Sequence, residues 1–304
     1  MQREVEEVVG SALPHERRRD RWLIWLKGVS RRWLLPLPGG AVWHELLIFG
    51  VLQAWACLFA GILLATILLT KLGYPAWMPI ARYDLILAVA LGTQAALLLA
   101  RMERLAEAKV ILIFHVVATV MELFKTAKGS WIYPEPSLIR IQGVPLFSGF
   151  LYSAVGSYMA RCWRLFDFRF TRYPDVRSTW VIAVAIYVNF FAHHFIVDLR
   201  YAILLAIALA YGRTWIHFTI DEVPRRMPLL LGFFLVAIFI WIAENIGSFS
   251  TVWLYPHQLA VWSPVKIEKL GSWFLLMIVS FVLVTLVNRP LPLGAARDRA
   301  LAER

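Results

Sequence analysis

The feature that most constrains this chain is a series of apolar runs long enough to cross a lipid bilayer. A hydrocarbon core about 30 Å thick takes about 20 apolar residues in an α-helix. With 60% hydrophobic and 17% charged residues, the chain has too little polar surface to enclose its apolar mass in water. The runs are too long, and alternate too little, to be strands of an outer-membrane barrel. They predict an all-α, polytopic membrane helix bundle.

About eight transmembrane helices are expected, with ends uncertain by a few residues: 46–70, 84–101, 108–124, 144–162, 178–197, 200–218, 228–248 and 270–288. The third run is short, and the sixth contains Arg213. The expected organisation is therefore an N-terminal cytoplasmic segment over 1–45, a bundle over 46–288 and a cytoplasmic tail over 289–304.

The basic residues are distributed unevenly between the two sides of these runs. With a cytoplasmic N-terminus, 23 of the 31 Lys and Arg residues lie in the segments 1–45, 101–109, 161–177, 213–227 and 289–304. The positive-inside rule then places both termini in the cytoplasm. No cleavable signal peptide precedes the first apolar run. The net charge of +11 thus reflects orientation, and no nucleic-acid partner is expected.

The segment RWLIWLKGVSRRWLL, ahead of the first run, has the pattern of an amphipathic helix. Its apolar stripe consists of Trp22, Trp25, Leu26, Val29 and Trp33, with arginines beside it. Basic, tryptophan-bearing helices lie in the interface among anionic head groups. The pattern predicts a helix on the inner membrane surface with lipids as partners.

A polar motif occurs twice, as MELFKTAKGSWIYPEP and as IAENIGSFSTVWLYPHQ. In each copy a glutamate, Glu122 or Glu244, precedes by nine residues a tryptophan that leads into Y-P. Four expected spans separate the copies, and an even number means that both copies point the same way. The motif favours an internal duplication, with parallel four-helix repeats over about 46–162 and 178–288.

This topology places both glutamates at the outer ends of their helices, with Trp and Tyr at head-group level. One interpretation is a pair of interface anchors. The other is that two carboxylates converge on an outward-facing pocket, because ionisable groups in a bilayer tend to face a cavity or a partner. Under the second interpretation the residues expected to contact a substrate are Lys125, Trp131, Tyr133, Glu135, Trp253, Tyr255 and His257.

The two copies differ in the residue that follows each glutamate by three. Lys125 is expected to keep Glu122 ionised, whereas Gly247 gives Glu244 no cation nearby in sequence, so Glu244 is the expected proton donor. Further along, His194 and Asp198 are four residues apart. On one helix they would share a face, either as a carboxylate-oriented histidine or as a hydrated helix end. The expected catalytic set is Glu122, Glu244, His194 and Asp198.

Other patterns have structural explanations. Gly149, Ser153 and Gly156 permit close helix approach, and Arg161 and Arg164 fit topological determinants. His115 is expected to be a core histidine rather than a proton relay. Cys57 and Cys162 lie on different expected spans, which does not favour a disulfide or a thiolate site. Phosphate-binding loops, dinucleotide fingerprints, nucleophile elbows and clustered metal-binding histidines are lacking, so no cofactor and no metal are predicted.

The strings E-x-F-K-T-x-x-G-S-W-x-Y-P-E and G-V-P-L-F-S-G-F-x-Y-x-x-V-G-S-Y, over about 122–158, resemble a bacterial membrane-protein family known as domain of unknown function 817. The resemblance extends over most of the chain beyond the N-terminal 40 residues and implies no activity. A glutamate at a helix end, a glycine, a tyrosine-bearing loop and a following G-V-P are also similar to membrane carotenoid hydratases and cyclases. That second similarity implies protonation of a polyene substrate.

The leading hypothesis is an inner-membrane enzyme that acts on a hydrophobic, isoprenoid-like small molecule by carboxylate acid/base chemistry at the outer side. The first alternative is a proton-coupled transporter whose two halves rock about Glu122 and Glu244. The second is a structural or partner-binding membrane protein. The sequence defines neither the substrate nor the oligomeric state.

Overall fold

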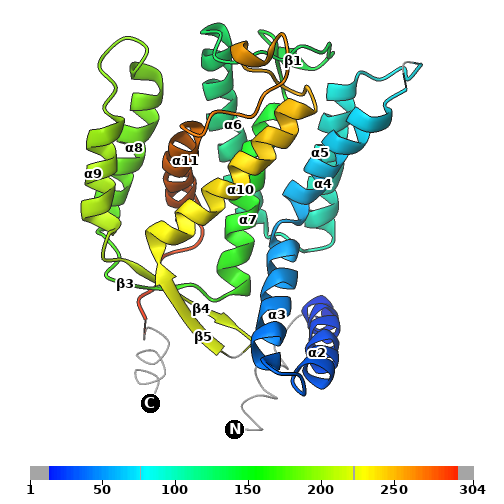
Figure 1. The fold of residues 1–304 in the computed structure, drawn as a ribbon, viewed down its shortest axis with the longest axis vertical. Coiled ribbons are helices and arrows are strands. Elements are labelled where there is room, and N and C mark those ends of the chain that lie inside the picture. Colours follow the sequence, from blue (N-terminus) through cyan, green and yellow to red (C-terminus); the bar gives the residue numbers. More distant parts are fainter. Residues whose placement is uncertain (1–13, 76, 222, 294–304) are drawn as a thin grey trace. The chain divides into compact units, whose positions relative to one another are not determined.

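Helices dominate the computed structural model, which describes residues 14–75, 77–221 and 223–293 (Figure 1). The predictions for the two chain ends, 1–13 and 294–304, lie outside the described residues. The helices are α2 Pro14–Leu34, α3 Gly40–Ala56, α4 Leu58–Gly73, α5 Arg82–Leu99, α6 Leu105–Ala127, α7 Phe147–Leu165, α8 Val176–Ala192, α9 Arg200–Tyr211, α10 Leu229–Phe249 and α11 Lys269–Val284. The chain is a polytopic helical membrane bundle, as the apolar runs predicted.

Within the described ranges, three helices are individually long and apolar enough to cross a membrane: α5, α6 from Glu107, and α10. The first expected span, 46–70, is divided at Cys57, so α3 and α4 would count as a fourth only if they form one broken span. α8, α9 and α11 are apolar but shorter. The sixth span ends at Tyr211 rather than 218, because the chain turns at Gly212 and continues as a strand.

The described residues form two compact units. Unit 1 comprises Met1–Trp55 with Thr219–Pro224, and unit 2 comprises Ala56–Phe218 with Arg225–Arg304. In unit 1, Asp221 binds three groups: Lys27 Nζ at 2.8 Å, Arg31 Nη2 at 2.9 Å and His44 Nε2 at 2.8 Å. Burial alone would raise the pKa of Asp221, but these hydrogen bonds and charges outweigh it and hold the pKa well below its usual range.

The amphipathic segment of the sequence is helical and forms part of α2. Within unit 1, the side chains of Trp25 and Trp33 remain 66% and 72% exposed. Their exposure leaves the apolar stripe available to a lipid surface, and the interfacial location stays a prediction.

A small sheet was not predicted. β3 Arg169–Thr171, β4 Trp215–Ile220 and β5 Val223–Pro228 lie in the order β3-β4-β5, and β3 pairs antiparallel with β4. The β4 sequence WIHFTI is rich in β-branched and aromatic residues. The strand ends at Ile220, and Asp221 after it has a φ of 43°, a left-handed conformation that is common in turns. The apolar run hid this signal, because β4 continues the hydrophobic composition of α9.

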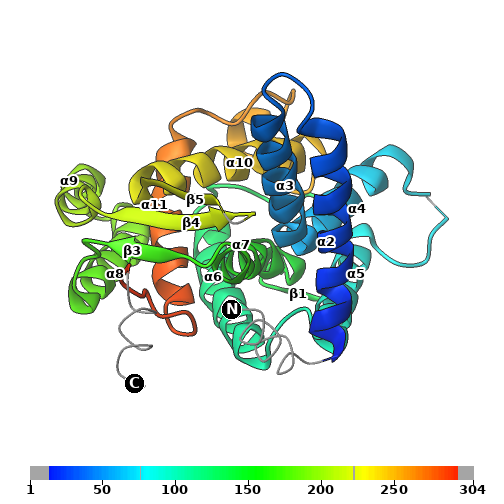
Figure 2. The same ribbon diagram turned by 90° about the horizontal axis from the view of Figure 1, so that it is seen from below.

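Helix α7 lies near the centre of unit 2, in contact with α4, α5, α6 and α11 (Figure 2). Two glycines bring it close to α6. A Cβ at Gly149 would lie 2.4 Å from Nδ1 of His115, and a Cβ at Gly156 would lie 3.0 Å from the ring of Phe114. The close approach expected from the small residues of α7 is confirmed, and His115 packs in this contact.

Buried ion pairs hold the C-terminal part of α7 beside the start of α6. Arg161 Nη2 lies 3.1 Å from Oε1 of Glu103, and Arg164 Nε lies 3.0 Å from Oε1 of Glu107. Both carboxylates are almost fully buried. Arg161 and Arg164 are therefore more than topological determinants, because removing one partner of a buried pair leaves an uncompensated charge.

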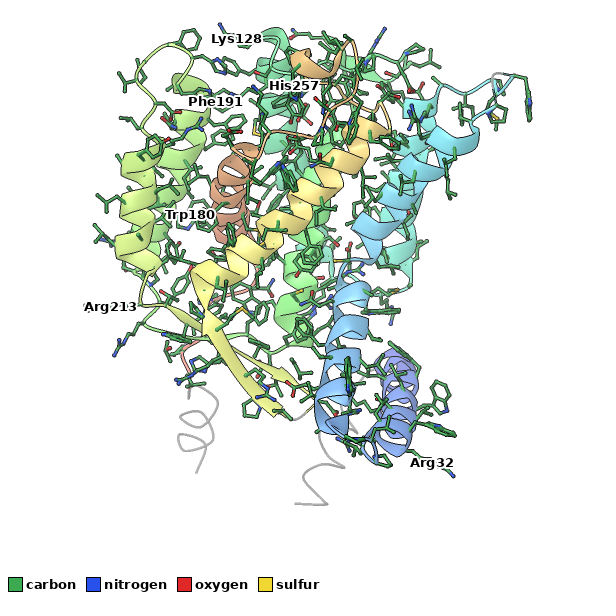
Figure 3. The ribbon with its side chains drawn as sticks, in the orientation of Figure 1. Arg32, Lys128, Trp180, Phe191, Arg213 and His257 are labelled. Carbon is green, nitrogen blue, oxygen red and sulfur yellow. The ribbon has the colours of Figure 1, made fainter. Side chains whose placement is uncertain are left out.

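The loops 128–146 and 250–268 follow α6 and α10, and we call this end of unit 2 the motif end. Lys128, Phe191 and His257 lie at the motif end, and Arg213 lies at the opposite end (Figure 3). The helices α6 and α10 thus end on the same side, as the parallel arrangement of the two motifs required.

Candidate functional site

The two W-x-Y-P loops pair with each other at the motif end. The Ile132 N–H donates to the Leu254 carbonyl and the Leu254 N–H donates to the Ile132 carbonyl, both at 2.9 Å. These residues occupy the same place in each motif, between Trp and Tyr, and form an isolated antiparallel bridge. Segments 122 residues apart in sequence are therefore adjacent in space.

Glu122 lies under this bridge and is only 2% exposed. Its carboxylate accepts three hydrogen bonds: from Trp131 Nε1 at 2.8 Å, from the Tyr133 hydroxyl at 2.6 Å and from the Tyr152 hydroxyl at 2.7 Å. Trp131 and Tyr133 come from its own motif, and Tyr152 comes from α7. The carboxylate ties α6, its following loop and α7 together.

Glu244 is similarly buried, at 4% exposure, and accepts two hydrogen bonds. The donors are the Tyr255 hydroxyl, from its own motif, and Trp273 Nε1, from α11. Burial, and next the charge of Glu244, raise the pKa of Tyr255 far above its usual range. The phenol therefore stays protonated and acts as a donor to Glu244.

Aromatic rings and one lysine connect the two carboxylates. The rings of Trp131 and Tyr255 are 6.0 Å apart, and those of Tyr152 and Trp273 are also 6.0 Å apart. The Lys269 ammonium lies 5.2 Å from the centre of the Trp131 ring and 4.7 Å from that of Tyr255. We call Glu122, Glu244 and these five side chains the paired-glutamate cluster. The two glutamates thus belong to one cluster, but the functional interpretation of the motif also required both carboxylates to face one pocket.

The expected ion pair between Glu122 and Lys125 is wrong. Lys125 Nζ lies 2.8 Å from Nε2 of His194 and 3.4 Å from Nε2 of His193, and it lies over the Phe190 ring. A spacing of three residues brings two helical positions near each other, but here α8 provides Lys125 with other partners. The lysine whose charge interacts with both glutamates is Lys269 instead. Sequence reasoning missed it because it lies at the start of another helix.

The predicted face shared by His194 and Asp198 is not formed. α8 ends at Ala192, so the helical spacing does not apply. Asp198 instead binds Asn189 Nδ2 at 3.0 Å and Arg200 Nε at 2.6 Å. Partial burial would raise the pKa of Asp198, but hydrogen bonds from Asn189 and Arg200 lower it overall. Asp198 therefore anchors the α8–α9 connection rather than orienting His194.

Three other residues that were predicted to contact a substrate lie in separate places. Trp253 packs on α10, where a Cβ at Gly247 would lie 2.1 Å from its Cη2 atom. His257 is exposed and stacks on the Tyr255 ring, with ring centres 5.8 Å apart. Glu135 binds Arg82 Nη1 at 2.6 Å, away from the paired-glutamate cluster.

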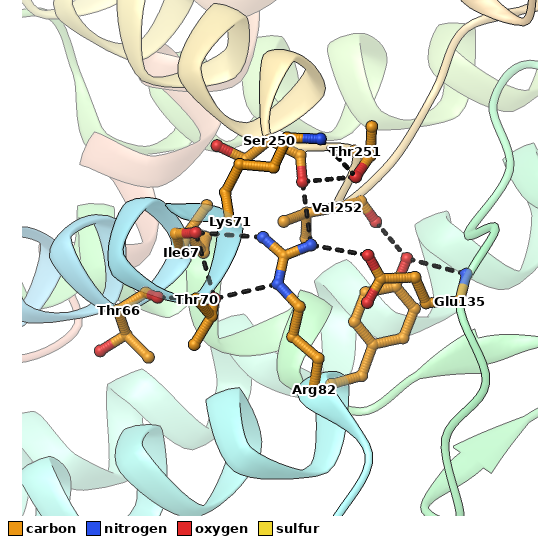
Figure 4. A network of polar contacts seen from close by, with 10 residues as sticks. Thr66, Ile67, Thr70, Lys71, Arg82, Glu135, Ser250, Thr251 and Val252 are labelled. Carbon is orange, nitrogen blue, oxygen red and sulfur yellow. Dashed lines mark hydrogen bonds and ion pairs between the residues drawn. The ribbon is translucent and has the colours of Figure 1, made fainter. Parts of the chain in front are cut away.

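Arg82 forms a second polar network, shown in Figure 4. Besides Glu135, its guanidinium donates to the Thr70 hydroxyl at 2.9 Å, the Ser250 carbonyl at 2.9 Å and the Ile67 carbonyl at 3.0 Å. The side chain is only 7% exposed. Arg82 therefore connects α4, α5 and both motif loops, a role that no local spacing in the sequence indicates.

A cavity of about 700 Å³ lies beside the paired-glutamate cluster, between α6, α8, α9 and α11. Trp131, Tyr255 and Lys269 line it, and the two glutamates do not. Ile186, Leu204, Leu275, Leu276 and Val279 also line it. The volume is that of a small-molecule site, with apolar walls and a few polar groups. Sequence reasoning predicted an outward pocket but not its walls, which come from helices that the motif does not include.

The described residues contain no group of three or more His, Cys, Asp and Glu side chains that is placed to hold a metal ion. Cys57 and Cys162 form no disulfide within the described part of the chain.

The chain resembles known proteins in sequence and in structure. The family described as "Protein of unknown function (DUF817)" matches residues 45–281. The uncharacterized protein YoaT of Bacillus subtilis is 39% identical over 240 residues, which are 79% of this chain and 90% of that protein. Among solved structures, the Insig homolog MvINS from Mycobacterium vanbaalenii has a TM-score of 0.44 and 16% identity, covering 62% of this chain and 97% of that one.

A cross-linked trimer of MvINS gives a TM-score of 0.45, also at 16% identity, and covers 62% of this chain and 98% of that chain. None of these matches extends the resemblance to carotenoid hydratases and cyclases. The family match spans both copies of the motif and the helices that line the cavity, and the chain belongs to the DUF817 family of uncharacterised membrane proteins.

Proposed function

We propose that this protein binds a hydrophobic small molecule inside the membrane, in the cavity at the motif end. The observation that carries the proposal is the cavity itself, about 700 Å³ between four helices. Ligand sites commonly have this size and lie between helices of bundles. The multi-pass location and the hydrophobic ligand expected from the sequence are consistent with a site that a lipid-soluble molecule enters from the bilayer.

The charge distribution of the sequence supports an orientation for this site. With both termini cytoplasmic in a bacterial inner membrane, the motif end would lie at the outer surface. The cavity would then open toward the outer leaflet.

The experiment is to fill the cavity and measure what the protein retains. Leu204→Trp, on the cavity wall, would occupy the space that a ligand needs. Leu205→Trp is the matched control, because Leu205 is the next residue of α9 and is 61% exposed. Mass spectrometry of molecules extracted from the purified proteins is expected to find a hydrophobic species with the natural protein and with Leu205→Trp, and to find it depleted with Leu204→Trp. Equal retention by both variants, or no bound species in any of them, would refute the binding function.

A second candidate is the acid/base enzyme expected from the paired glutamates. It is favoured by Tyr255, which lines the cavity and donates its hydroxyl hydrogen bond to Glu244. In this scheme Tyr255 passes a proton between the ligand and Glu244, and Glu122 positions the loop through Trp131.

Tyr255→Phe separates this scheme from simple binding, because it removes the hydroxyl and keeps the ring. An enzyme would lose conversion of the co-purified species while still retaining it, and Glu244→Gln would behave in the same way. Unchanged composition of the bound species in membranes expressing natural protein and Tyr255→Phe would exclude chemistry through this pair. Movement of the species driven by a pH gradient in proteoliposomes would instead favour a proton-coupled transporter.

A further inference from the structure

The charged residues around the cavity indicate which class of ligand it binds. This inference rests on the proposed binding function. Four basic residues line it, Lys125, Arg200, Lys266 and Lys269, against one acidic residue, Glu268. All five lie at the motif end, in the last turn of α6, at the first residue of α9, and in or just after the second motif loop. The cavity therefore has a strongly positive end.

Two of these cations are held by neutral groups rather than by carboxylates. Lys125 is only 4% exposed, and its ammonium is in contact with two imidazoles and the Phe190 ring. Lys269 lies on the faces of Trp131 and Tyr255. In the described part of the chain neither lysine forms an ion pair. A desolvated ammonium without a counterion is costly, so an anion brought by a ligand would offset that cost.

The nearby glutamates do not remove this need. Glu122 and Glu244 attract Lys269 from a distance, but their oxygens already accept hydrogen bonds from tyrosine and tryptophan donors. Arg200 adds a third cation. Its Nε binds Asp198, and among the described residues its terminal nitrogens bind no acceptor, so they can bind one from a ligand.

The opposite part of the cavity is apolar. Leu275, Leu276 and Val279 continue along α11 from Lys269, and Ile186 and Leu204 face them from α8 and α9. From Lys269 to Val279 the helix rises about 15 Å at 1.5 Å per residue. A ligand that fills this space needs a charged head at one end and a hydrocarbon chain along the rest.

We infer that the ligand is an amphiphile with an anionic head group, a carboxylate or a phosphate, bound among Lys125, Arg200 and Lys269, with its chain between α8, α9 and α11. The head group replaces the missing counterion of the two lysines. The chain occupies the apolar wall that Leu204→Trp would fill.

The test uses three probes with one hydrocarbon chain: oleate, oleyl phosphate and oleyl alcohol. Native mass spectrometry of the full chain in detergent would give the apparent Kd of each. Charge-assisted hydrogen bonds contribute about 1.5–3 kcal/mol, so the anionic probes are expected to bind roughly ten- to a hundredfold more tightly than the alcohol. A preference for oleyl phosphate identifies a phosphorylated lipid as the source, and a preference for oleate identifies a fatty acid.

Lysine variants assign the head-group site. Lys125→Met and Lys269→Met are each expected to weaken the better anionic probe about tenfold and to leave oleyl alcohol unchanged. Lys128→Met is the matched control, since Lys128 is exposed at the same end but does not line the cavity. Lys269→Met carries the test by itself if Lys125→Met does not fold.

The outcomes separate this inference from the proposed function. Equal binding of the alcohol and both anions overturns the anionic head group while the hydrophobic site stands. Equal weakening by Lys128→Met also overturns it, because the effect would then be surface charge. Failure of all three probes to bind, with no effect of Leu204→Trp, would overturn the binding function and this inference together.

Discussion

The two copies of the motif have the same spacing but different surroundings. In the first copy, Trp131 turns toward Glu122 and its indole N–H binds the carboxylate. In the second copy, Trp253 packs on Gly247 instead, and Glu244 takes its indole donor from Trp273 of α11. The backbones of the two copies pair symmetrically, whereas their side chains do not.

One residue explains this difference. A Cβ at position 247 would lie 2.1 Å from the Trp253 ring, so only glycine allows the indole to lie there. The matching position in the first copy is Lys125, and there the tryptophan Trp131 binds Glu122 instead. The lesson is that two copies of one spacing can place their tryptophans differently: Trp131 binds Glu122 and lines the cavity, whereas Trp253 packs on Gly247.

Removing either carboxylate of the two motifs should cause the largest loss of stability. Glu122→Ala leaves three donors without an acceptor, and Glu244→Ala leaves two. Each orphaned buried donor costs about 1–3 kcal/mol, so we expect losses of at least about 3 kcal/mol for Glu122→Ala and at least about 2 kcal/mol for Glu244→Ala.

Thermal unfolding in detergent measures both losses. Glu122→Gln and Glu244→Gln are the controls, because an amide keeps one acceptor oxygen and should preserve most of the stability. A larger loss for Glu244→Ala than for Glu122→Ala would contradict the comparison of the two copies.

Replacing the glycine in the second copy should cause the next largest loss of stability. Gly247→Ala forces the Trp253 ring to move, and overpacking of this kind costs about 1–3 kcal/mol. Gly92→Ala is the control, since nothing lies within 4 Å of a Cβ at that position of α5. There the change should stabilise the helix by about 0.5–1 kcal/mol. If both alanine variants melted at the temperature of the natural protein, steric exclusion would not explain where Trp253 lies.

Replacing the residue that follows each Y-P should cause a smaller difference in stability between the two copies. Glu135→Gln removes the carboxylate charge opposite buried Arg82, which keeps its other acceptors, so we expect a loss of about 1–2 kcal/mol. His257→Ala removes an exposed ring and should change stability by less than about 0.5 kcal/mol. Equal melting temperatures for these two variants would mean that the Arg82 network does not distinguish the copies.

The smallest expected effect is a change in the pKa of one histidine, His194. Partial desolvation, and next the charge of Lys125, lower the pKa of His194. Removing a positive charge favours the protonated imidazole, so Lys125→Met should raise the pKa of His194, as followed by NMR of labelled histidines. Lys128→Met should raise it less, because Lys128 affects His194 more weakly than Lys125 does. A larger shift from Lys128→Met would show that Lys125 does not bind this ring in solution.

Local patterns predicted much of the fold. Helices lie on all eight expected apolar runs, and the amphipathic segment is helical. The runs misplaced the end of α9 and hid β4, because composition continues across Gly212 while the backbone changes conformation. The repeated spacing also predicted that Glu122 and Glu244 lie near each other. It failed for His194 and Asp198, since a helical period holds only while the helix continues, and α8 ends first.

By itself, then, the sequence determined the membrane class, the positions of the helices and the location of two motifs at one end. Periodic apolar runs, turn residues and a repeated spacing act over short distances along the chain, so they can be read without a structure. Tertiary structure decided that Lys125 faces two histidines, that the charge of Lys269 interacts with both glutamates and that four helices line a cavity. These outcomes depend on which helices become neighbours, because a buried charge takes its partners from whatever packs against it rather than from the residues adjacent in sequence.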